Sequence, residues 1–144
     1  MRFDGEWLAC EDGVVRPVIR AEILAAAGAW RAVEFLVDSG ADRTVISANV
    51  LESLGLPTAP SPEPIGGVGG LVASVSVRTQ IRLTRNDGGK VILHGEYAAI
   101  PTAEALDLSV LGRDILNLFA LIVDRAAAVV TIIGARHHYT IEER

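Results

Sequence analysis

The sequence predicts an all-β domain, mainly antiparallel, with one or two short helices. Three observations predict it: apolar and polar residues alternate over residues 74–84, turn-forming residues separate the apolar runs, and helical spacing is scarce. Apolar residues make up 50% of the chain and aromatic residues only 5%, so the core must consist mainly of Val, Ile, Leu and Ala. The 144 residues suffice for one domain but not for two catalytic lobes of ordinary size.

Two long hairpins are expected. In the first, residues 14–24 and 30–37 flank a turn of small residues centred on Gly28. In the second, residues 74–84 lead into an Asn-Asp-Gly-Gly turn, whose residues tolerate the positive φ of tight hairpins. Residues 90–100 should therefore return antiparallel to that strand.

Helical signals are confined to two short stretches. Residues 47–54 have Ser47 as a suitable N-cap, two leucines at helical spacing, and Gly55 as a stop signal. A second short helix is expected over residues 113–119. Between the first helix and a glycine cluster, four prolines predict an extended connection.

The chain ends are expected to be accessory to one central domain. Residues 1–13 are interpreted as an N-terminal extension, residues 14–134 as the domain, and residues 135–144 as a polar C-terminal tail. The domain should close with a hairpin of residues 120–124 and 129–133, which bracket an Arg-Ala-Ala-Ala turn.

Composition excludes several classes of function. A net charge of −5 without a basic run argues against binding of nucleic acid. No apolar run approaches the ~20 residues that span a bilayer, so no membrane partner is expected. Cys10 is the only cysteine, which rules out an intrachain disulfide and favours a reducing compartment, with the cytoplasm as the expected location.

A carboxylate follows an apolar stretch in the segment Phe-Leu-Val-Asp-Ser-Gly-Ala, where Asp38 precedes Ser39, Gly40 and Ala41. The three small residues allow a tight turn and a close approach of the backbone. An ionised Asp at the end of a buried strand is costly unless something stabilises it. Taken alone, the segment fits equally well an Asx-turn in which Asp38 only closes the loop.

The wider segment, residues 35–46, resembles the active-site turn of retropepsin-like (retroviral-type) aspartic proteases and of cellular relatives such as the protease-like domain of DNA-damage-inducible proteins. Two further segments resemble the same family in the same order. Residues 64–71 resemble its glycine-rich flap hairpin, and residues 110–116 resemble the apolar-apolar-Gly motif before its C-terminal helix. The resemblance covers most of residues 14–133 and implies a retropepsin-like acid protease fold with one lobe per chain.

The resemblance implies an aspartic endopeptidase, a peptide hydrolase that is active as a homodimer. Two carboxylates brought within ~3 Å share one proton, so one acts as the base on a water molecule and the other as the acid. Because the chain has a single Asp-Ser-Gly, Asp38 must meet Asp38 of a second chain. Ser39 is expected to bond across the interface, Gly40 to approach the carboxylates, and Asp42 to pair with Arg113 as a structural brace. No metal and no cofactor is expected.

The glycine cluster has three interpretations. A phosphate-binding loop is disfavoured because no Lys-Ser/Thr follows the glycines. A hairpin tip without function is the plain alternative, and a mobile flap over an extended peptide is the favoured interpretation. The residues assigned to the flap and to substrate binding are Ile65, Gly66, Gly67, Val68, Gly69 and Gly70. Candidate pocket-wall positions are Ala41, Arg43, Ile65, Val68 and Ile100.

Other polar residues are discounted as functional groups. His137 and His138 lie in a polar terminus without further ligands at metal-binding spacing. Asp114 is interpreted as the acidic residue at a helix start, and Asp124 as a turn residue. The main rival to an enzyme is a catalytically silent retropepsin-like module for dimerisation or peptide binding; the presence of Asp38 together with the glycine cluster favours the enzyme.

Overall fold

The computed structural model describes residues 1–61, 63–67, 70–102, 108–134 and 142–143. Strands dominate these residues, and two short helices accompany them, which confirms the predicted all-β class. The elements in chain order are β1 (Arg2–Asp4), β2 (Glu6–Ala9), β3 (Val15–Leu24), β4 (Trp30–Val37), β5 (Val45–Ile46), α1 (Ala48–Leu54), β6 (Ala59–Pro60), β7 (Ile65–Gly67), β8 (Gly70–Val72), β9 (Val75–Thr84), β10 (Lys90–Ala99), β11 (Ser109–Leu111), α2 (Arg113–Leu116), β12 (Phe119–Asp124) and β13 (Val129–Gly134).

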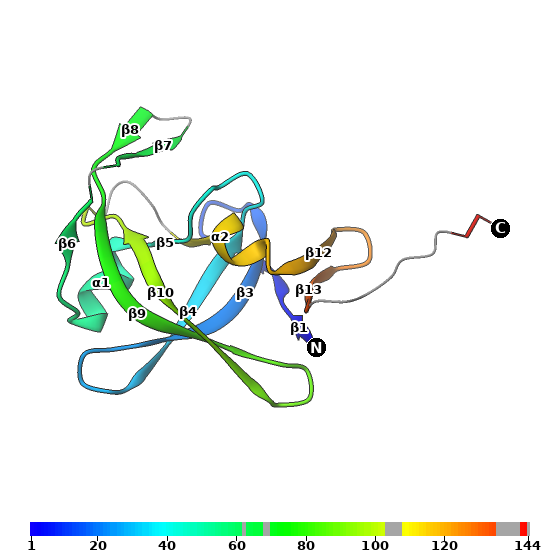
Figure 1. Cartoon of the computed structure of the whole chain (residues 1–144). Coiled ribbons are helices and arrows are strands. Elements are labelled where there is room, and N and C mark those ends of the chain that lie inside the picture. The colour runs from blue at the N-terminus through cyan, green and yellow to red at the C-terminus, as the bar shows by residue number, and fades with distance from the viewer. Residues whose placement is uncertain (62, 68–69, 103–107, 135–141, 144) are drawn as a thin grey trace.

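The largest sheet closes on itself as a small barrel (Figure 1). Its strands follow the order β3-β4-β11-β5-β10-β9, and β3 pairs with β9 to complete the ring. Most pairs are antiparallel, whereas β4–β11 and β5–β10 are parallel. The interior is aliphatic with few aromatic rings, as the composition requires, and its largest fully buried side chains in these strands include Ile19, Ile23, Phe35, Ile81, Leu83 and Leu111.

Both predicted long hairpins are present. Strand β3 pairs with β4 from Val18↔Leu36 to Leu24↔Trp30, and Gly28 in the turn has φ +87°. Strand β9 pairs with β10 along its whole length, and Gly88 in that turn has φ +89°. Both glycines occupy left-handed backbone conformations that side chains disfavour, which explains why the turns form where the sequence places glycine.

The first helix lies where the sequence predicted it, and the second is shorter than predicted. Ser47 is the N-cap residue of α1 and Gly55 ends that helix with φ +61°, but the Ser47 side chain makes no capping bond. Helix α2 ends at Leu116, so its predicted extent to residue 119 is wrong. Phe119 instead begins β12, where it pairs with Gly134 and contacts the ring of Phe3 at a centroid distance of 5.6 Å.

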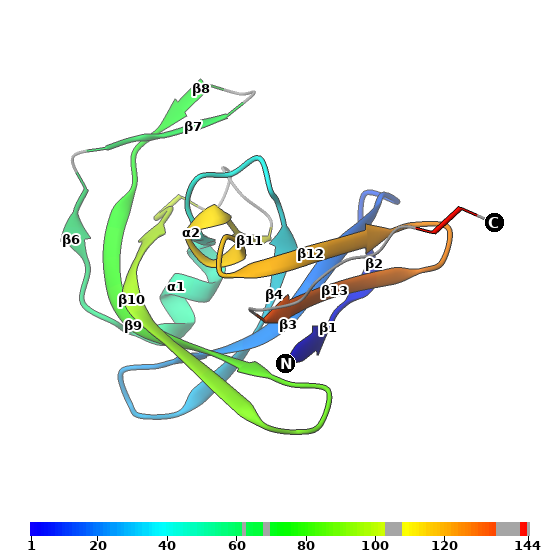
Figure 2. The ribbon, with the colours of Figure 1, turned by 45° about the vertical axis from the view of Figure 1, so that its right-hand side comes forward.

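The first residues form two strands that the sequence did not predict. Strand β1 pairs with β13, which also pairs with β12 in a separate three-stranded sheet, and β2 pairs with β3 at the barrel (Figure 2). Phe3 is only 1% exposed and belongs to the main core. Trp7 donates its indole N–H to the carbonyl oxygens of Asp124 and Val129, both at 3.2 Å. The N-terminal residues are therefore packed against the rest of the chain.

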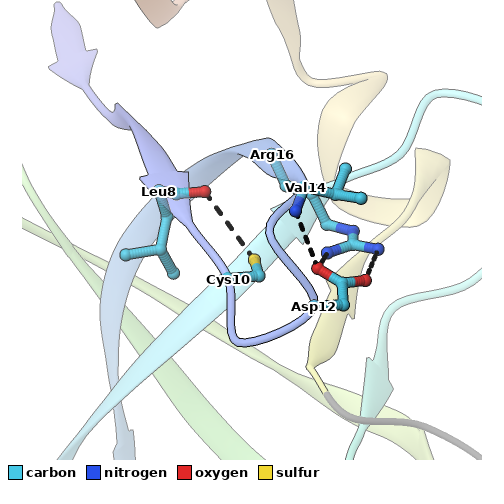
Figure 3. Close-up of polar contacts among 5 residues, drawn as sticks. All are labelled: Leu8, Cys10, Asp12, Val14 and Arg16. Atoms are coloured by element: carbon cyan, nitrogen blue, oxygen red, sulfur yellow. Dashed lines mark hydrogen bonds and ion pairs between the residues drawn. The ribbon is translucent and has the colours of Figure 1, made fainter.

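A compact turn joins β2 to β3 (Figure 3). The Asp12 carboxylate accepts hydrogen bonds from the Arg16 guanidinium at 2.9 and 2.6 Å and from the Val14 amide at 3.0 Å. The Arg16 hydrogen bond, followed by the Val14 amide, lowers the pKa of Asp12 from 3.8 to about 2. Cys10 lies in the same turn, with its Sγ 3.7 Å from the carbonyl oxygen of Leu8.

Neither helix in the described part of the chain has the length and apolar character needed to cross a membrane. Of the predicted C-terminal tail, residues 135–141 and 144 lie outside the described residues, as do His137 and His138.

Candidate active site

Asp38 lies immediately after β4, at the start of a tight turn. Val37, the last residue of β4, pairs with Leu111 of β11, and the Asp38 amide donates to the Leu111 carbonyl oxygen at 3.2 Å. The Ala41 amide then donates to the carbonyl oxygen of Asp38 at 3.2 Å. The pairing of β4 with β11 thus fixes where the Asp38 backbone leaves the barrel.

Residue Asp38 is half-buried, and its carboxylate is bonded within its own turn. Its Oδ1 accepts the amide N–H of Gly40 at 2.9 Å, which is the Asx-turn geometry that the plain interpretation predicts. A Cβ at residue 40 would lie 3.2 Å from this oxygen, tighter than most side-chain contacts. Within the described residues, Oδ2 has no hydrogen-bond partner, and Ser39 and Gly40 are exposed. The turn therefore holds one carboxylate oxygen and leaves the other available.

The first residues of α2 also form hydrogen bonds with this turn. The Arg113 amide donates to the Ala41 carbonyl oxygen at 2.8 Å, and the Asp114 amide donates to the Asp42 carbonyl oxygen at 3.3 Å. The Arg113 guanidinium donates to the Ser39 carbonyl oxygen at 3.1 Å and forms an ion pair with the Asp42 carboxylate. The structure thus brings together Asp42 and Arg113, which lie 71 positions apart in the sequence.

A second set of contacts holds the far end of the turn, and sequence reasoning missed it. Thr44 is fully buried, and its amide and hydroxyl donate to Asp114 Oδ1 at 2.9 and 2.6 Å. The Gly112 amide donates to the Thr44 hydroxyl oxygen at 3.1 Å. Asp114 does lie in the first turn of α2, as expected, but its carboxylate also reaches a residue 70 positions away. Only the position of Asp114 next to Arg113 could have suggested this contact.

The glycine cluster forms a hairpin that projects beyond the barrel (Figures 1 and 2). Strands β7 and β8 pair antiparallel, with Ile65 opposite Val72, Gly66 opposite Leu71, and Gly67 opposite Gly70. Val68 and Gly69, which the sequence assigns to the tip, lie outside the described residues. Leu71 is 75% exposed.

A small apolar cluster connects the base of this hairpin with the Asp38 turn. The cluster has four buried members, and four half-buried residues pack against them, including Ile65, Val72 and Ala41. Three of the predicted pocket-wall positions, Ala41, Ile65 and Ile100, belong to this set, whereas Arg43 does not. The buried members are Val45, Ala98, Ile100 and Val110, and the fourth half-buried residue is Leu36. The turn and the hairpin therefore border one apolar surface.

Comparison with known families decides the classification. Residues 24–115, well over half of the chain, match the family model described as aspartyl protease. The chain belongs to the aspartyl protease family. The matched residues of this aspartyl protease family member contain the Asp38 turn, the glycine-rich hairpin and the start of α2.

Solved structures agree with the family on the fold. The EIAV protease in complex with the inhibitor HBY-793 is 25% identical, with a TM-score of 0.53 and coverage of 71% of this chain and 86% of that chain. A retropepsin-like aspartic protease from Rickettsia conorii is 14% identical, with a TM-score of 0.54 and coverage of 92% and 90%. No curated protein matches the chain. The predicted retropepsin-like family and fold are thereby confirmed.

Other chemistry near the site of this family member is limited. Among the described residues, no three His, Cys, Asp or Glu side chains gather closely enough to hold a metal ion. Burial, and secondarily the negative charge of Asp114, raises the pKa of Tyr97 to about 12. The Tyr97 hydroxyl donates to the Leu93 carbonyl oxygen at 2.9 Å, so this side chain is held neutral inside the barrel wall.

Proposed function

We propose that the protein is an aspartic endopeptidase that acts as a homodimer, with Asp38 of each chain forming the catalytic pair. The observation that carries the proposal is the Asp38 turn. Asp38 is half-buried, the Gly40 amide bonds to its Oδ1, and Arg113 bonds to the Ser39 carbonyl oxygen in the same turn. The family and the retropepsin-like fold support a peptidase. Ser39 and Gly40 are exposed, as residues at a contact between two chains need to be before assembly.

Two copies are required because one chain supplies one such carboxylate. The 144 residues contain a single Asp-Ser-Gly-Ala segment. A two-fold axis beside the turns would bring the two Asp38 side chains together. At a separation of ~3 Å the two carboxylates cannot both be ionised, so the pair holds one proton.

The shared proton gives the pair its chemistry. The ionised Asp38 takes a proton from a water molecule as the water oxygen attacks the peptide carbonyl carbon, while the protonated Asp38 donates its proton to the carbonyl oxygen. The tetrahedral intermediate then collapses and the C–N bond breaks. The leaving nitrogen receives a proton from one Asp38, while the other Asp38 takes the proton of one hydroxyl group of the intermediate. The products are a carboxylic acid and an amine, and the pair again holds one proton.

The β7–β8 hairpin acts as the flap over an extended substrate in this proposal. Its backbone groups can pair with a peptide strand, and its glycines give the freedom to close. The apolar cluster that links Ile65 and Val72 with Ala41 offers a surface for substrate side chains. The substrate would be an unfolded or extended polypeptide, because a folded chain cannot fit between a hairpin and a turn.

A catalytically silent dimerisation or peptide-binding module is the second candidate. One observation favours it: the bond from Gly40 to Asp38 Oδ1 is what a purely structural Asx-turn would also have. The chain contains a matched control for this case. Asp87 Oδ1 accepts the amide of Gly89 at 3.0 Å in an exposed hairpin turn, which is the same local geometry without the family context.

The deciding experiment compares cleavage of a denatured protein by the wild type, Asp38→Asn and Asp87→Asn between pH ~4 and ~7. The oligomeric state of all three is measured alongside. The endopeptidase predicts cleavage by the wild type and Asp87→Asn but not by Asp38→Asn, with equal dimers. Absence of cleavage by every variant would favour the silent module.

A further inference from the structure

We propose that Thr44 and Asp114 are positioning residues that hold the Asp38 turn in its catalytic geometry. The inference rests on the proposed function, because it states how this chain keeps its half of the active site in place. Neither side chain lies in the turn of residues 38–41, and neither is expected to touch substrate. They act through the backbone.

Asp114 Oδ1 accepts three hydrogen bonds. It accepts the Thr44 amide at 2.9 Å, the Thr44 hydroxyl at 2.6 Å and the Ile115 amide at 2.9 Å. The Thr44 hydroxyl in turn accepts the Gly112 amide at 3.1 Å. Hydrogen bonds to a carboxylate are stronger than those between neutral groups. One carboxylate thus ties Thr44 to the first residues of α2.

These contacts hold the turn at both of its ends. At its start, the Asp38 amide bonds to the carbonyl oxygen of Leu111. At its end, Thr44 bonds to Gly112 and Asp114. Both ends of the segment of residues 38–44 therefore bond to the same four consecutive residues, 111–114. Asp38 follows β4, and Thr44 precedes β5. Release of the end at Thr44 would remove the buried side-chain anchor and leave the turn held at Asp38 and by the exposed contacts of Arg113.

The burial of Thr44 distinguishes its contacts from the Arg113–Asp42 ion pair. The Asp42 and Arg113 side chains are 81% and 44% exposed, so solvent weakens their attraction. Thr44 is 0% exposed, and loss of its hydroxyl would leave the buried Gly112 amide without its acceptor. We therefore assign the larger share of the positioning to Thr44 and Asp114. Catalysis needs groups held within roughly 0.5 Å of their productive places.

The test uses Thr44→Val, which keeps the shape and removes the hydroxyl, and Thr44→Ser, which restores the hydroxyl. Thr79→Val is the matched control. Thr79 lies on β9, is also buried, and donates its hydroxyl to the Leu24 carbonyl oxygen at 2.8 Å. With a peptide substrate, Thr44→Val should lower kcat roughly 10- to 100-fold with KM within about twofold. Thr44→Ser should recover most of this loss, and Thr79→Val should retain the kcat of the wild type.

Amide hydrogen exchange provides a readout that does not depend on cleavage. Thr44→Val should speed exchange at the amides of Gly40 and Ala41, both of which bond to Asp38, and leave β12 and β13 unchanged. Should Thr44→Val fail to fold, Asp114→Ala removes the carboxylate that accepts from the Thr44 amide and hydroxyl, and Asp114→Asn keeps an acceptor at the same place. Asp114→Ala should then show the kcat loss and the faster exchange, with partial recovery in Asp114→Asn.

The inference is overturned by an unchanged kcat in the folded variant that breaks the contact, or by a lower kcat with unchanged exchange at Gly40 and Ala41. A wild type that cleaves nothing would refute the proposed function instead. In that case the exchange data still decide whether Thr44 and Asp114 hold the turn.

Discussion

The α-carbon of Gly112 packs directly against the backbone of Arg43. A Cβ at residue 112 would overlap the carbonyl carbon and oxygen of Arg43, and it would lie 2.8 Å from the Thr44 amide nitrogen. Gly112 has φ −100°, so glycine is required here by space rather than by backbone conformation. This close approach lets residues 111–114 bond to the Asp38 turn along its whole length.

The first prediction concerns the packing of Gly112 against the backbone of Arg43. Gly112→Ala should lower the free energy of unfolding by about 3 kcal/mol, because the backbone of Arg43 cannot move aside without breaking the bonds to residues 111–114. Urea unfolding measures the change. Gly66→Ala is the control, since a Cβ there meets only the exposed Leu71 side chain at 3.3 Å, and it should stay within about 0.5 kcal/mol of the wild type. Equal effects of the two variants would contradict the steric argument.

A second prediction concerns the ion pair. Arg113 bonds to the Ser39 carbonyl oxygen and to the Asp42 carboxylate with different nitrogens, which a single ammonium group cannot reproduce. Arg113→Lys should therefore reduce kcat/KM about tenfold while stability changes by less than about 1 kcal/mol, since the pair is exposed. Arg85→Lys, at the exposed pair with Asp87, controls for the loss of a surface guanidinium. If both variants keep full activity, the brace has no role in catalysis.

The third prediction addresses the N-terminal strands. Phe3 is 1% exposed and contacts Phe119, so Phe3→Ala should cost about 3–5 kcal/mol of stability. Val14→Ala, at a side chain 48% exposed in the same part of the chain, should have little effect. Deletion of residues 1–13 should prevent folding, as judged by circular dichroism. A stable deletion variant would mean that this segment is a detachable extension, as the sequence suggested.

The fourth prediction concerns acid. The pKa of Asp12 is about 2 in the folded protein against an ordinary value of 3.8, so the folded state favours its ionised form. The stabilising contribution of the Asp12–Arg16 contact is present above pH ~4 and disappears as the pH falls towards ~2. Thermal unfolding across this window should show a shallower loss of stability in Asp12→Asn than in the wild type. Glu11→Gln serves as the control for removal of a neighbouring charge, and parallel curves for all three proteins would refute the contribution.

Sequence patterns predicted the local parts of the fold well. Alternating residues and glycine turns located both long hairpins, because each hairpin forms between neighbours in the chain. The short strands β5 and β11 carry no periodic signal, since two or three residues are too few to show one. Helix α2 was predicted too long because the pairing of Phe119 with Gly134 overrides local helical preference.

The sequence likewise predicted some parts of the candidate site and not others. The Asp38 turn and the Asp42–Arg113 pair were expected from motifs that resemble a known family. The Thr44–Asp114 contact was missed because it joins residues 70 positions apart and neither residue type signals a partner. Strands β1 and β2 were missed because they are short and polar at alternate or irregular positions, and only their pairing with β13 and β3 identifies them.

The central claim is that Asp38 is one half of an active site that a second copy completes. The most direct measurement titrates a fixed amount of active wild-type protein with Asp38→Asn chains under conditions that allow exchange of subunits. A tenfold excess should lower the cleavage rate to roughly a tenth of its starting value under random pairing, because mixed pairs lack one carboxylate. Asp87→Asn chains in the same excess should add activity. A cleavage rate that is unaffected by excess Asp38→Asn would contradict the claim.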